Sequence, residues 1–190
     1  MLAVENTFKE MGTMEQYDEI VARCKNLFSR KLKDYHCAWR VMRLASLTDQ
    51  IYIKASRIRS IENKGVQLVD EGVNSEFIAI VNYSIIALIQ LERGVAEEID
   101  MSAEEAIAAY EKHSEVIRQL MIAKNHDYGE AWRQMRIASI TDLILQKLLR
   151  VKQIEDNNGV TVASEGLDAN YQDMFNYAVF ALIRLEENLA

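Results

Sequence analysis

The sequence predicts an all-α protein with six main helices, arranged as two tandem three-helix repeats that pack into one pseudo-two-fold helical bundle. Three observations support this prediction. Proline is absent and only 7 of the 190 residues are glycine, so little interrupts long helices. Apolar residues recur at spacings of three and four along most of the chain. Finally, one block of mainly polar and aromatic residues occurs twice in the same order.

The repeated block begins at Lys31 and again at Lys124. The second copy reads Lys-Asn-His-Asp-Tyr-Gly-Glu-Ala-Trp-Arg-Gln-Met-Arg, and the first copy keeps its Lys, Asp, Tyr, Trp and both Arg residues. Two copies of a hydrophobic core need to share only apolar residues of suitable volume. Polar residues that stay in register therefore indicate either a binding site or a demanding polar framework.

The first helix of each repeat is predicted from a capping pattern followed by apolar residues at helical spacing. Thr13 with Gln16 fits a capping box, and Ser102 with Glu105 fits another. We expect the first helix to end near Lys31. The chain divides into a loosely attached lead-in, a first repeat, a short acidic linker and a second repeat within one compact body: 1–12, 13–95, 96–101 and 102–190.

The second and third helices follow in each repeat. Ser46 with Asp49, and Ser139 with Asp142, stand before apolar-periodic runs and are interpreted mainly as helix starts. The second helices should end near Gly65 and Gly159, each in a polar neighbourhood that suits a C-cap. The third helices should cover 75–93 and 170–190.

Composition limits the classes of function. The net charge of -7 argues against general binding to nucleic-acid backbones, which favours a basic face. The two cysteines, Cys24 and Cys37, have no counterparts in the other repeat, so neither a disulfide framework nor a zinc site is expected. With no signal-peptide pattern and only a short apolar run at 85–89, we expect a cytoplasmic protein without a membrane span.

Repeated cations are candidates for binding an anion. Lys54 and Arg57, and likewise Lys147 and Arg150, are three residues apart, with each lysine inside the apolar stripe of the second helix. Buried charges need a partner or a cavity. One interpretation is structural: an internal ion pair, with Glu71 in the first repeat and Glu165 in the second, or a side chain whose apolar stem is buried while its charge reaches solvent. The other is a phosphate site.

The third helices carry a repeated Asn-Tyr pair. Asn82 and Asn176 lie inside the apolar stripe, where each could simply crosslink helices. In the second copy Asp173 precedes Asn176 on the same face, and these oxygen ligands suit Mg²⁺. The first copy has Ala79 instead of the Asp, which favours the second repeat as the competent one.

The other repeated residues also have two interpretations. Asp34 and Asp127 either cap a short helix that holds the Trp or point a carboxylate at a metal or at a ribose hydroxyl. Trp39 and Trp132 either belong to the core or stack on a base. The Arg residues three apart either lie on a solvated surface or form a basic fork; they are Arg40, Arg43, Arg133 and Arg136.

As a set, these motifs resemble a small bacterial and phage family called nucleotide modification associated domain 1. They are Lys-x-x-Asp-Tyr-Gly, Trp-Arg, Ser-x-Thr-Asp, Lys-x-x-Arg and Asp-x-x-Asn-Tyr. The resemblance covers both repeats and implies a helical domain linked to modified nucleotides. The first repeat departs from it at His36 and Ala79. A more distant likeness is to the all-α pyrophosphohydrolases of the MazG kind, although their paired carboxylate motif is not evident here.

We therefore expect a nucleotide-binding helical protein, with magnesium-dependent hydrolysis of a nucleoside phosphate as its candidate activity and homo-oligomerisation left open. The alternative is a non-catalytic interaction module with a buried polar network. Candidate phosphate or substrate residues are Lys31, Arg40, Arg43, Lys54, Arg57, Asn82, Lys124, Tyr128, Trp132, Arg133, Arg136, Lys147, Arg150, Asn176 and Tyr177. Candidate magnesium ligands are Asp34, Asp127, Glu165 and Asp173.

Overall fold

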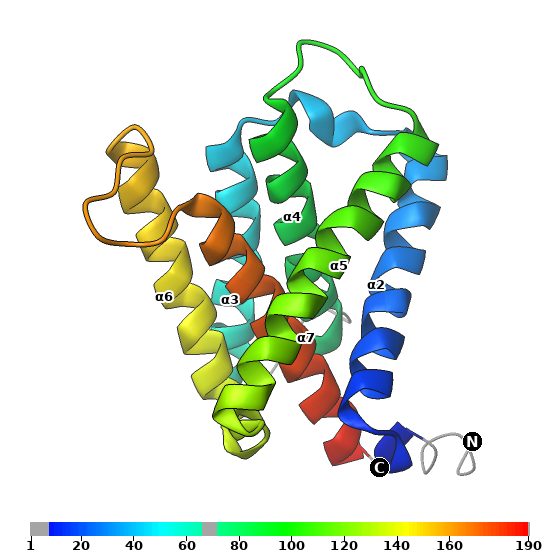
Figure 1. The fold of residues 1–190 in the computed structure, drawn as a ribbon, viewed down its shortest axis with the longest axis vertical. Helices are drawn as coiled ribbons and strands as arrows, with labels where there is room; N and C mark the ends of the chain where they lie inside the picture. Colours follow the sequence, from blue (N-terminus) through cyan, green and yellow to red (C-terminus); the bar gives the residue numbers. More distant parts are fainter. Residues whose placement is uncertain (1–7, 66–71, 190) are drawn as a thin grey trace.

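The computed structural model describes residues 8–65 and 72–189, and six long helices follow one another in the predicted order (Figure 1). They are α2 (Thr13–Tyr35), α3 (Leu44–Lys64), α4 (Val73–Arg93), α5 (Ala103–Tyr128), α6 (Ile137–Asp156) and α7 (Leu167–Leu189). Each repeat also holds its Trp on a short 3-10 turn; these turns are η1 (Ala38–Val41) and η2 (Ala131–Gln134). The described residues contain no strand, which confirms the all-α prediction.

The two first helices begin differently. At α5 the predicted capping box is confirmed, because the Glu105 N–H donates to Ser102 Oγ (3.1 Å) and the Ser102 N–H donates to Glu105 Oε2 (2.9 Å). At α2 the predicted box is wrong by one residue. Gly12 is the N-cap there, and its N–H donates to Glu15 Oε2 (3.0 Å). Gln16 is buried and serves another purpose, described below.

The predicted capping boxes of the second helices are wrong. Both α3 and α6 begin before the Ser residues that we expected to cap them. Their Asp residues instead make ion pairs between the repeats, Asp49 with Lys152 (2.6 Å) and Asp142 with Arg59 (2.9 Å). Gly65 does end α3 in the left-handed conformation (φ 66°), as a C-cap should.

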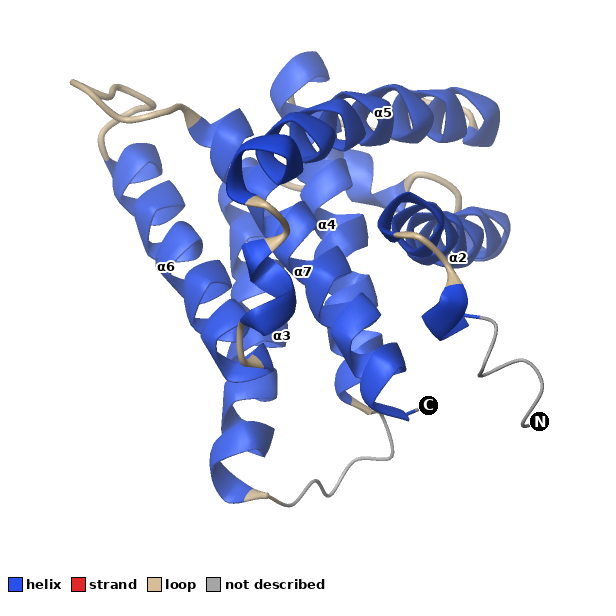
Figure 2. Ribbon diagram, turned by 60° about the horizontal axis from the view of Figure 1, so that its bottom comes forward, coloured by secondary structure: helices blue, strands red, loops and turns tan. Residues whose placement is uncertain are grey.

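The helices form three layers. Helices α4 and α7 pack against each other in the middle, with α3 and α6 on one side and α2 and α5 on the other (Figures 1 and 2). This arrangement buries most of α4. Although α4 has the length and mean hydropathy (1.3) of a membrane-spanning helix, 61% of that apolar window is buried inside the protein, as in a core helix.

Equivalent residues of the two repeats exchange partners across the pseudo-two-fold axis. The hydroxyl of Tyr17 on α2 donates to Asn176 Oδ1 on α7 (2.8 Å). The hydroxyl of Tyr110 on α5 donates to Asn82 Oδ1 on α4 (3.0 Å). The buried asparagine of each repeat therefore accepts a hydrogen bond from a tyrosine of the other repeat. Such a reciprocal pair of contacts is expected at a two-fold interface.

The described part of the lead-in packs onto the body. Phe8 is buried in the core cluster, and its carbonyl oxygen accepts from Gln16 Nε2 (3.0 Å). We expected residues 1–12 to be loosely attached, so this expectation is wrong for residues 8–12.

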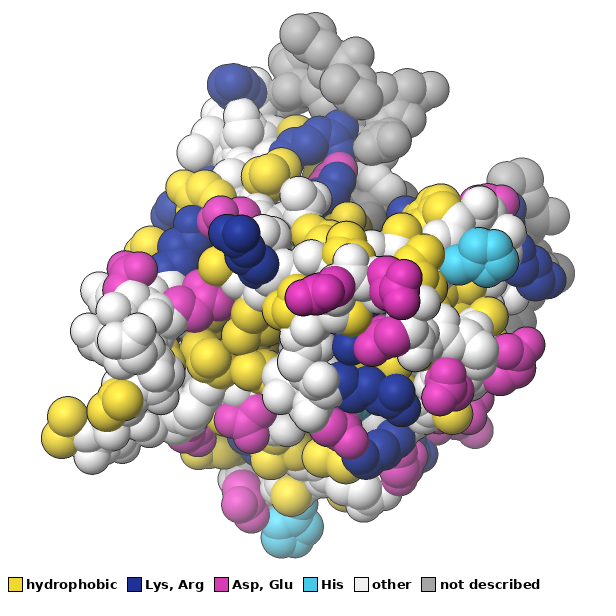
Figure 3. Space-filling model, turned by 90° about the horizontal axis from the view of Figure 1, so that it is seen from above, with side chains coloured by type: hydrophobic (Ala, Val, Ile, Leu, Met, Phe, Trp, Pro, Cys, Tyr) yellow, Lys and Arg dark blue, Asp and Glu magenta, His cyan; other side chains and the backbone are white. Residues whose placement is uncertain are grey.

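Charge is mixed on the face that Figure 3 shows. At this end of the molecule, described Lys and Arg side chains lie among Asp, Glu and hydrophobic ones, without a broad area of one sign. This distribution agrees with the acidic net charge of -7. It does not resemble the basic face that a nucleic-acid backbone favours.

Candidate functional site

A cavity of about 550 Å³ lies in the first repeat, between α2, η1, α3 and α4. Its lining includes Lys31 and Tyr35 from α2, Trp39 from η1, Lys54 from α3 and Asn82 from α4. Small-molecule sites are usually clefts of about 300 to 1,000 Å³ with mainly apolar walls and a few polar groups. The structure thus brings several residues of the repeated block together around one space.

The length of α2 explains part of this convergence. We expected the helix to end near Lys31, but it continues to Tyr35. Residues four apart lie on the same face of a helix, so Lys31 and Tyr35 both face the cavity. His36 then ends the helix with a positive φ (53°), where the second repeat has Gly129 (φ 59°). The glycine of the family pattern is therefore missing, although the chain still turns there.

Aromatic side chains form much of the cavity wall. Tyr35 is half exposed, Trp39 is buried and Tyr83 is intermediate. Burial, the nearby Tyr83 phenol and the Asp34 carboxylate raise the pKa of Tyr35 above its usual value, so the phenol stays protonated at neutral pH. Faces of this kind accept flat apolar rings, including nucleobases.

The two tryptophans differ in their hydrogen bonds. Trp132 stacks on Phe180 (4.3 Å between centroids) and donates from Nε1 to Asn125 Oδ1 (3.2 Å). Trp39 Nε1 is buried without a hydrogen-bond partner among the described residues, because Leu32 stands at the position equivalent to Asn125. Both Trp39 and Leu32 line the cavity. The core interpretation therefore fits Trp132, whereas Trp39 retains an unused donor.

The buried carboxylate of the first repeat is Glu76 on α4, which sequence reasoning missed. Lys54 Nζ lies 3.3 Å from Glu76 Oε2, and Arg57 pairs with Glu76 Oε1. We expected Glu71 as the partner of these cations, and Glu71 lies outside the described residues. The position of Lys54 inside the apolar stripe of α3 could have indicated such a partner, since a buried lysine needs a carboxylate on a facing helix. Lys31 makes no hydrogen bond or ion pair with the described residues and lies exposed at the cavity.

The repeated asparagines serve as crosslinks. Asn82 donates from Nδ2 to the Cys24 carbonyl on α2 (3.1 Å) and accepts from Tyr110 on α5. Asn176 accepts from Tyr17. The structural interpretation of these residues is therefore the one that the geometry supports, although Asn82 also borders the cavity.

In the second repeat the equivalent cations are joined by an aspartate. Asp173 Oδ1 lies 2.7 Å from Lys124 Nζ, and Asp173 Oδ2 lies 2.6 Å from Lys147 Nζ. Burial disfavours the charged form of Asp173, but hydrogen bonds from both lysines outweigh it and lower the pKa of this carboxyl. The internal ion pair expected between Lys147 and Glu165 is therefore wrong, because Asp173 takes that place.

The predicted magnesium ligands do not converge into a metal site. Asp173 is engaged by two lysines, and Asp127 is 75% exposed beside His126 (3.1 Å). Asp34 and Glu165 are also exposed. Within residues 8–65 and 72–189, no group of three or more His, Cys, Asp or Glu side chains is arranged to hold a metal ion. The four predicted ligands therefore do not form a preformed cluster, and magnesium binding stays a prediction.

The alternative that Asp34 and Asp127 cap the Trp turns is also wrong. Both residues lie in the last turns of α2 and α5, which continue to Tyr35 and Tyr128. The turns that follow have no side-chain cap. Tyr128 itself is 74% exposed and, unlike Tyr35, is largely in solvent.

Two of the four repeated arginines belong to the framework. Arg40 pairs with Asp100 (2.7 Å), donates to the Gly94 carbonyl (2.8 Å) and contacts Gln90. Arg43 and Arg136 are exposed. Neither residue of this exposed pair lines the cavity.

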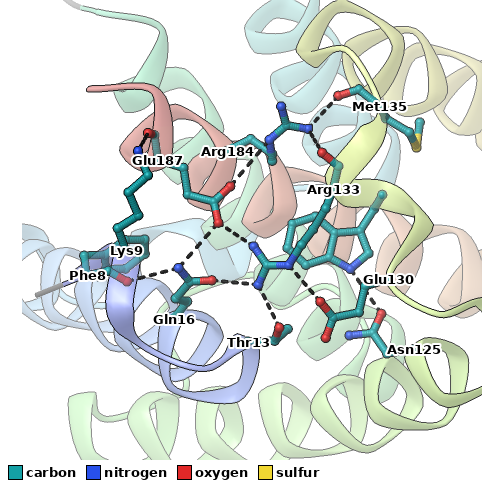
Figure 4. A network of polar contacts seen from close by, with 11 residues as sticks. Phe8, Lys9, Thr13, Gln16, Asn125, Glu130, Arg133, Met135, Arg184 and Glu187 are labelled. Atoms are coloured by element: carbon teal, nitrogen blue, oxygen red, sulfur yellow. Dashed lines mark hydrogen bonds and ion pairs between the residues drawn. The ribbon is translucent and has the colours of Figure 1, made fainter. Parts of the chain in front are cut away.

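Arg133 is the counterpart of Arg40, and its contacts join η2 to α2 and α7 (Figure 4). It pairs with Glu130 (2.7 Å) and Glu187 (2.5 Å), and it donates to Thr13 Oγ1 and Gln16 Oε1 (both 2.7 Å). The basic-fork interpretation is therefore not supported, because one arginine of each predicted fork is used inside the fold.

The remaining second-repeat candidates lie around Asp173. Tyr177 is intermediate in exposure and Arg150 is exposed. Burial and the Asp173 charge raise the pKa of Tyr177, whereas the Lys124 and Arg150 charges lower it by less. Tyr177 and the nearby cations therefore surround the carboxylate of Asp173, so the anion at this place is a side chain of the protein.

Comparison with known proteins gives one result. The sequence profile of the family described as Nucleotide modification associated domain 1 matches residues 31–91 and again residues 124–185, so it covers both repeats. No curated protein and no solved structure matches the chain. The two profile matches fall on the segments that carry the repeated motifs and together span more than half of the chain. The chain therefore belongs to the Nucleotide modification associated domain 1 family.

Proposed function

We propose that the protein binds a nucleoside phosphate in the cavity of the first repeat. The observation that carries this proposal is the cavity itself, which combines aromatic walls with Lys31 and Lys54. Sequence reasoning favoured the second repeat because of Asp173, whereas the geometry supports the first repeat better.

The chemistry of the lining suits the two ends of such a ligand. Tyr35, Trp39 and Tyr83 offer aromatic surface, and stacking of a base on an aromatic ring contributes about 1 to 3 kcal/mol. Lysine is a compact point charge that binds phosphate. Membership of a family named for nucleotide modification supports a ligand of this class.

We propose that any magnesium ion binds together with the nucleotide phosphate. Mg²⁺ usually keeps several waters and binds through one or two carboxylates together with substrate phosphates. In the described lining of the cavity the carboxylate is Glu76, which is paired with Lys54 and Arg57. We therefore propose binding as the primary function. Hydrolysis is a separate step, to be tested by phosphate release with and without Mg²⁺.

A second function, a non-catalytic interaction module, is favoured by the framework contacts. Arg40, Arg133, Asn82 and Asn176 are all repeated and all bind other parts of the chain. This interpretation explains the second repeat well. It does not explain why Lys31 and Tyr35 border an open cavity in the first.

Thermal melting against nucleoside mono-, di- and triphosphates, with and without Mg²⁺, tests the proposal. A ligand at a hundred times its dissociation constant stabilises the folded protein by about 2.7 kcal/mol, which is a readily measured shift. Tyr35→Ala should reduce the shift, because it removes stacking worth about 1 to 3 kcal/mol, and the matched change Tyr128→Ala in the second repeat should leave the shift intact. A panel without any shift, or equal effects of the two substitutions, would favour the interaction module.

A further inference from the structure

We propose that Asp173 is a built-in anion, which occupies in the second repeat the place that the ligand phosphate takes in the first. This inference rests on the proposed function and deepens it, because it locates the phosphate and narrows the ligand to a nucleoside monophosphate. It also explains why the cavity described above lies beside the first copy of the block, where Ala79 replaces the aspartate.

The second repeat supplies the geometric template. The Asp173 carboxylate on α7 bridges Lys124 on α5 and Lys147 on α6, with nitrogen–oxygen distances of 2.7 and 2.6 Å. Its side chain and that of Lys147 are each only 10% exposed. An oxyanion with two oxygens facing two ammonium groups is thus an arrangement that this fold accommodates.

The first repeat keeps the two lysines but has no carboxylate at the position of Asp173. Lys31 and Lys54 stand at the positions equivalent to Lys124 and Lys147, and Ala79 stands at the position of Asp173. All three residues line the cavity. A methyl group therefore replaces the carboxylate, and the space beside the two lysines is open.

The state of each lysine agrees with this interpretation. Lys31 makes no hydrogen bond or ion pair with the described residues. Lys54 lies 3.3 Å from Glu76, a carboxylate that also pairs with Arg57. Lys31 is exposed and Lys54 is partly buried, and together they place two ammonium groups beside the aromatic-walled cavity, an arrangement that attracts an incoming anion.

The charge of the pair indicates the ligand class. Lys31 and Lys54 can each contact an oxygen of one terminal phosphate, which carries roughly two negative charges at neutral pH. Tyr35 and Tyr83 line the same cavity and give the attached nucleoside an aromatic surface. A nucleoside monophosphate satisfies both features. A longer phosphate chain would bring charges for which this lysine pair has no counterpart.

Two reciprocal substitutions test the inference, measured by isothermal titration calorimetry with the deoxynucleoside monophosphates and with inorganic phosphate. Ala79→Asp copies the second-repeat arrangement into the first repeat, so it should fold with an unchanged or higher melting temperature and bind at least tenfold more weakly. Asp173→Ala should open a second site and raise the stoichiometry from one anion to two. Ala108→Asp, on the exposed surface of α5, controls for the added charge.

The outcomes separate this inference from the proposed function. If wild-type protein binds a monophosphate and Ala79→Asp binds it equally well, the inference is overturned while the proposed function stands. If wild-type protein binds no nucleotide but Asp173→Ala binds inorganic phosphate with a gain in melting temperature, the proposed function fails and Asp173 is still a built-in anion. If Asp173→Ala does not fold, the Ala79→Asp titration decides the question.

Discussion

Arg133 shows how a repeated polar residue can be retained for structure rather than for binding. Its guanidinium lies over the Trp132 ring (4.4 Å to the centroid) and contacts Glu130, Glu187 and Gln16. These contacts hold η2 against α2 and α7 (Figure 4). The position and type of this residue suggested a binding site, whereas its partners show a framework role.

Arg133→Ala should destabilise the protein substantially. The substitution leaves Glu187 and Gln16 without a main partner and removes the packing on Trp132. Breaking a hydrogen-bonded ionic network of this kind usually costs about 2 to 4 kcal/mol, to be measured by urea unfolding. Arg136→Ala, at an exposed position three residues away, should stay within about 0.5 kcal/mol. Equal effects of the two substitutions would contradict the framework role.

At the scale of elements, α3 and α6 are joined by exchanged polar contacts. The Thr48 hydroxyl donates to Glu155 (2.8 Å), and the equivalent Thr141 hydroxyl donates to Glu62 (3.0 Å). The pKa of each of these carboxyls is raised, mainly by burial against the facing helix. The interface between the repeats therefore contains two carboxylates whose charged form is disfavoured by folding.

Glu155→Gln should stabilise the protein at pH 7.5 by less than about 1 kcal/mol, a usual size for a partly exposed polar site. Burial is the largest cause of the raised Glu155 pKa, and the negative charges of Asp49 and Asp156 raise it further. The hydrogen bond from Thr48 and the positive charge of Lys152 lower this pKa by less. A carboxyl with a raised folded-state pKa contributes stability below its unfolded pKa of about 4.3 and loses it as the pH rises through the folded value.

Urea unfolding at several pH values checks this prediction. The advantage of Glu155→Gln should shrink as the pH falls from 7.5 towards 4, because the native carboxyl becomes neutral as well. A Glu155→Gln protein that is less stable than wild type at pH 7.5 would mean that the Lys152 and Thr48 contacts outweigh burial.

At the scale of the whole molecule, the two repeats are expected to unfold as one unit. Helices α4 and α7 form the middle layer, and each repeat supplies hydrogen-bond donors to the other through Tyr17 and Tyr110. Neither three-helix repeat can bury its apolar surface alone. Separation would therefore expose both the core and the exchanged polar groups.

The two tryptophans allow this expectation to be measured. The chain contains two Trp residues, one in each repeat, so Trp132→Phe leaves a reporter in the first repeat and Trp39→Phe leaves one in the second. For each variant, urea transitions followed by fluorescence and by circular dichroism should have the same midpoint. Each variant is compared with itself, since the substitutions themselves change stability. A fluorescence transition that precedes the loss of helix in either variant would mean that the repeats unfold separately.

The sequence by itself determined the helices, the duplication and the family. Helical periodicity, the Ser102–Glu105 box and the Gly65 cap are local signals, because they depend on residues within a turn or two of each other. The repeat was visible because polar residues recurred in register. Three helix starts were predicted wrongly, because the capping boxes expected at Thr13, Ser46 and Ser139 are not formed.

Only the tertiary structure decided which repeated residues face a cavity and which face each other. Asp173 was predicted as a magnesium ligand, but it lies between Lys124 and Lys147. Glu76 was not identified, although it is the carboxylate that Lys54 contacts. Such pairings join different helices, and their geometry depends on the angles and registers at which helices pack. A local sequence pattern does not encode those quantities, because it specifies which face of a helix is buried but not what that face meets.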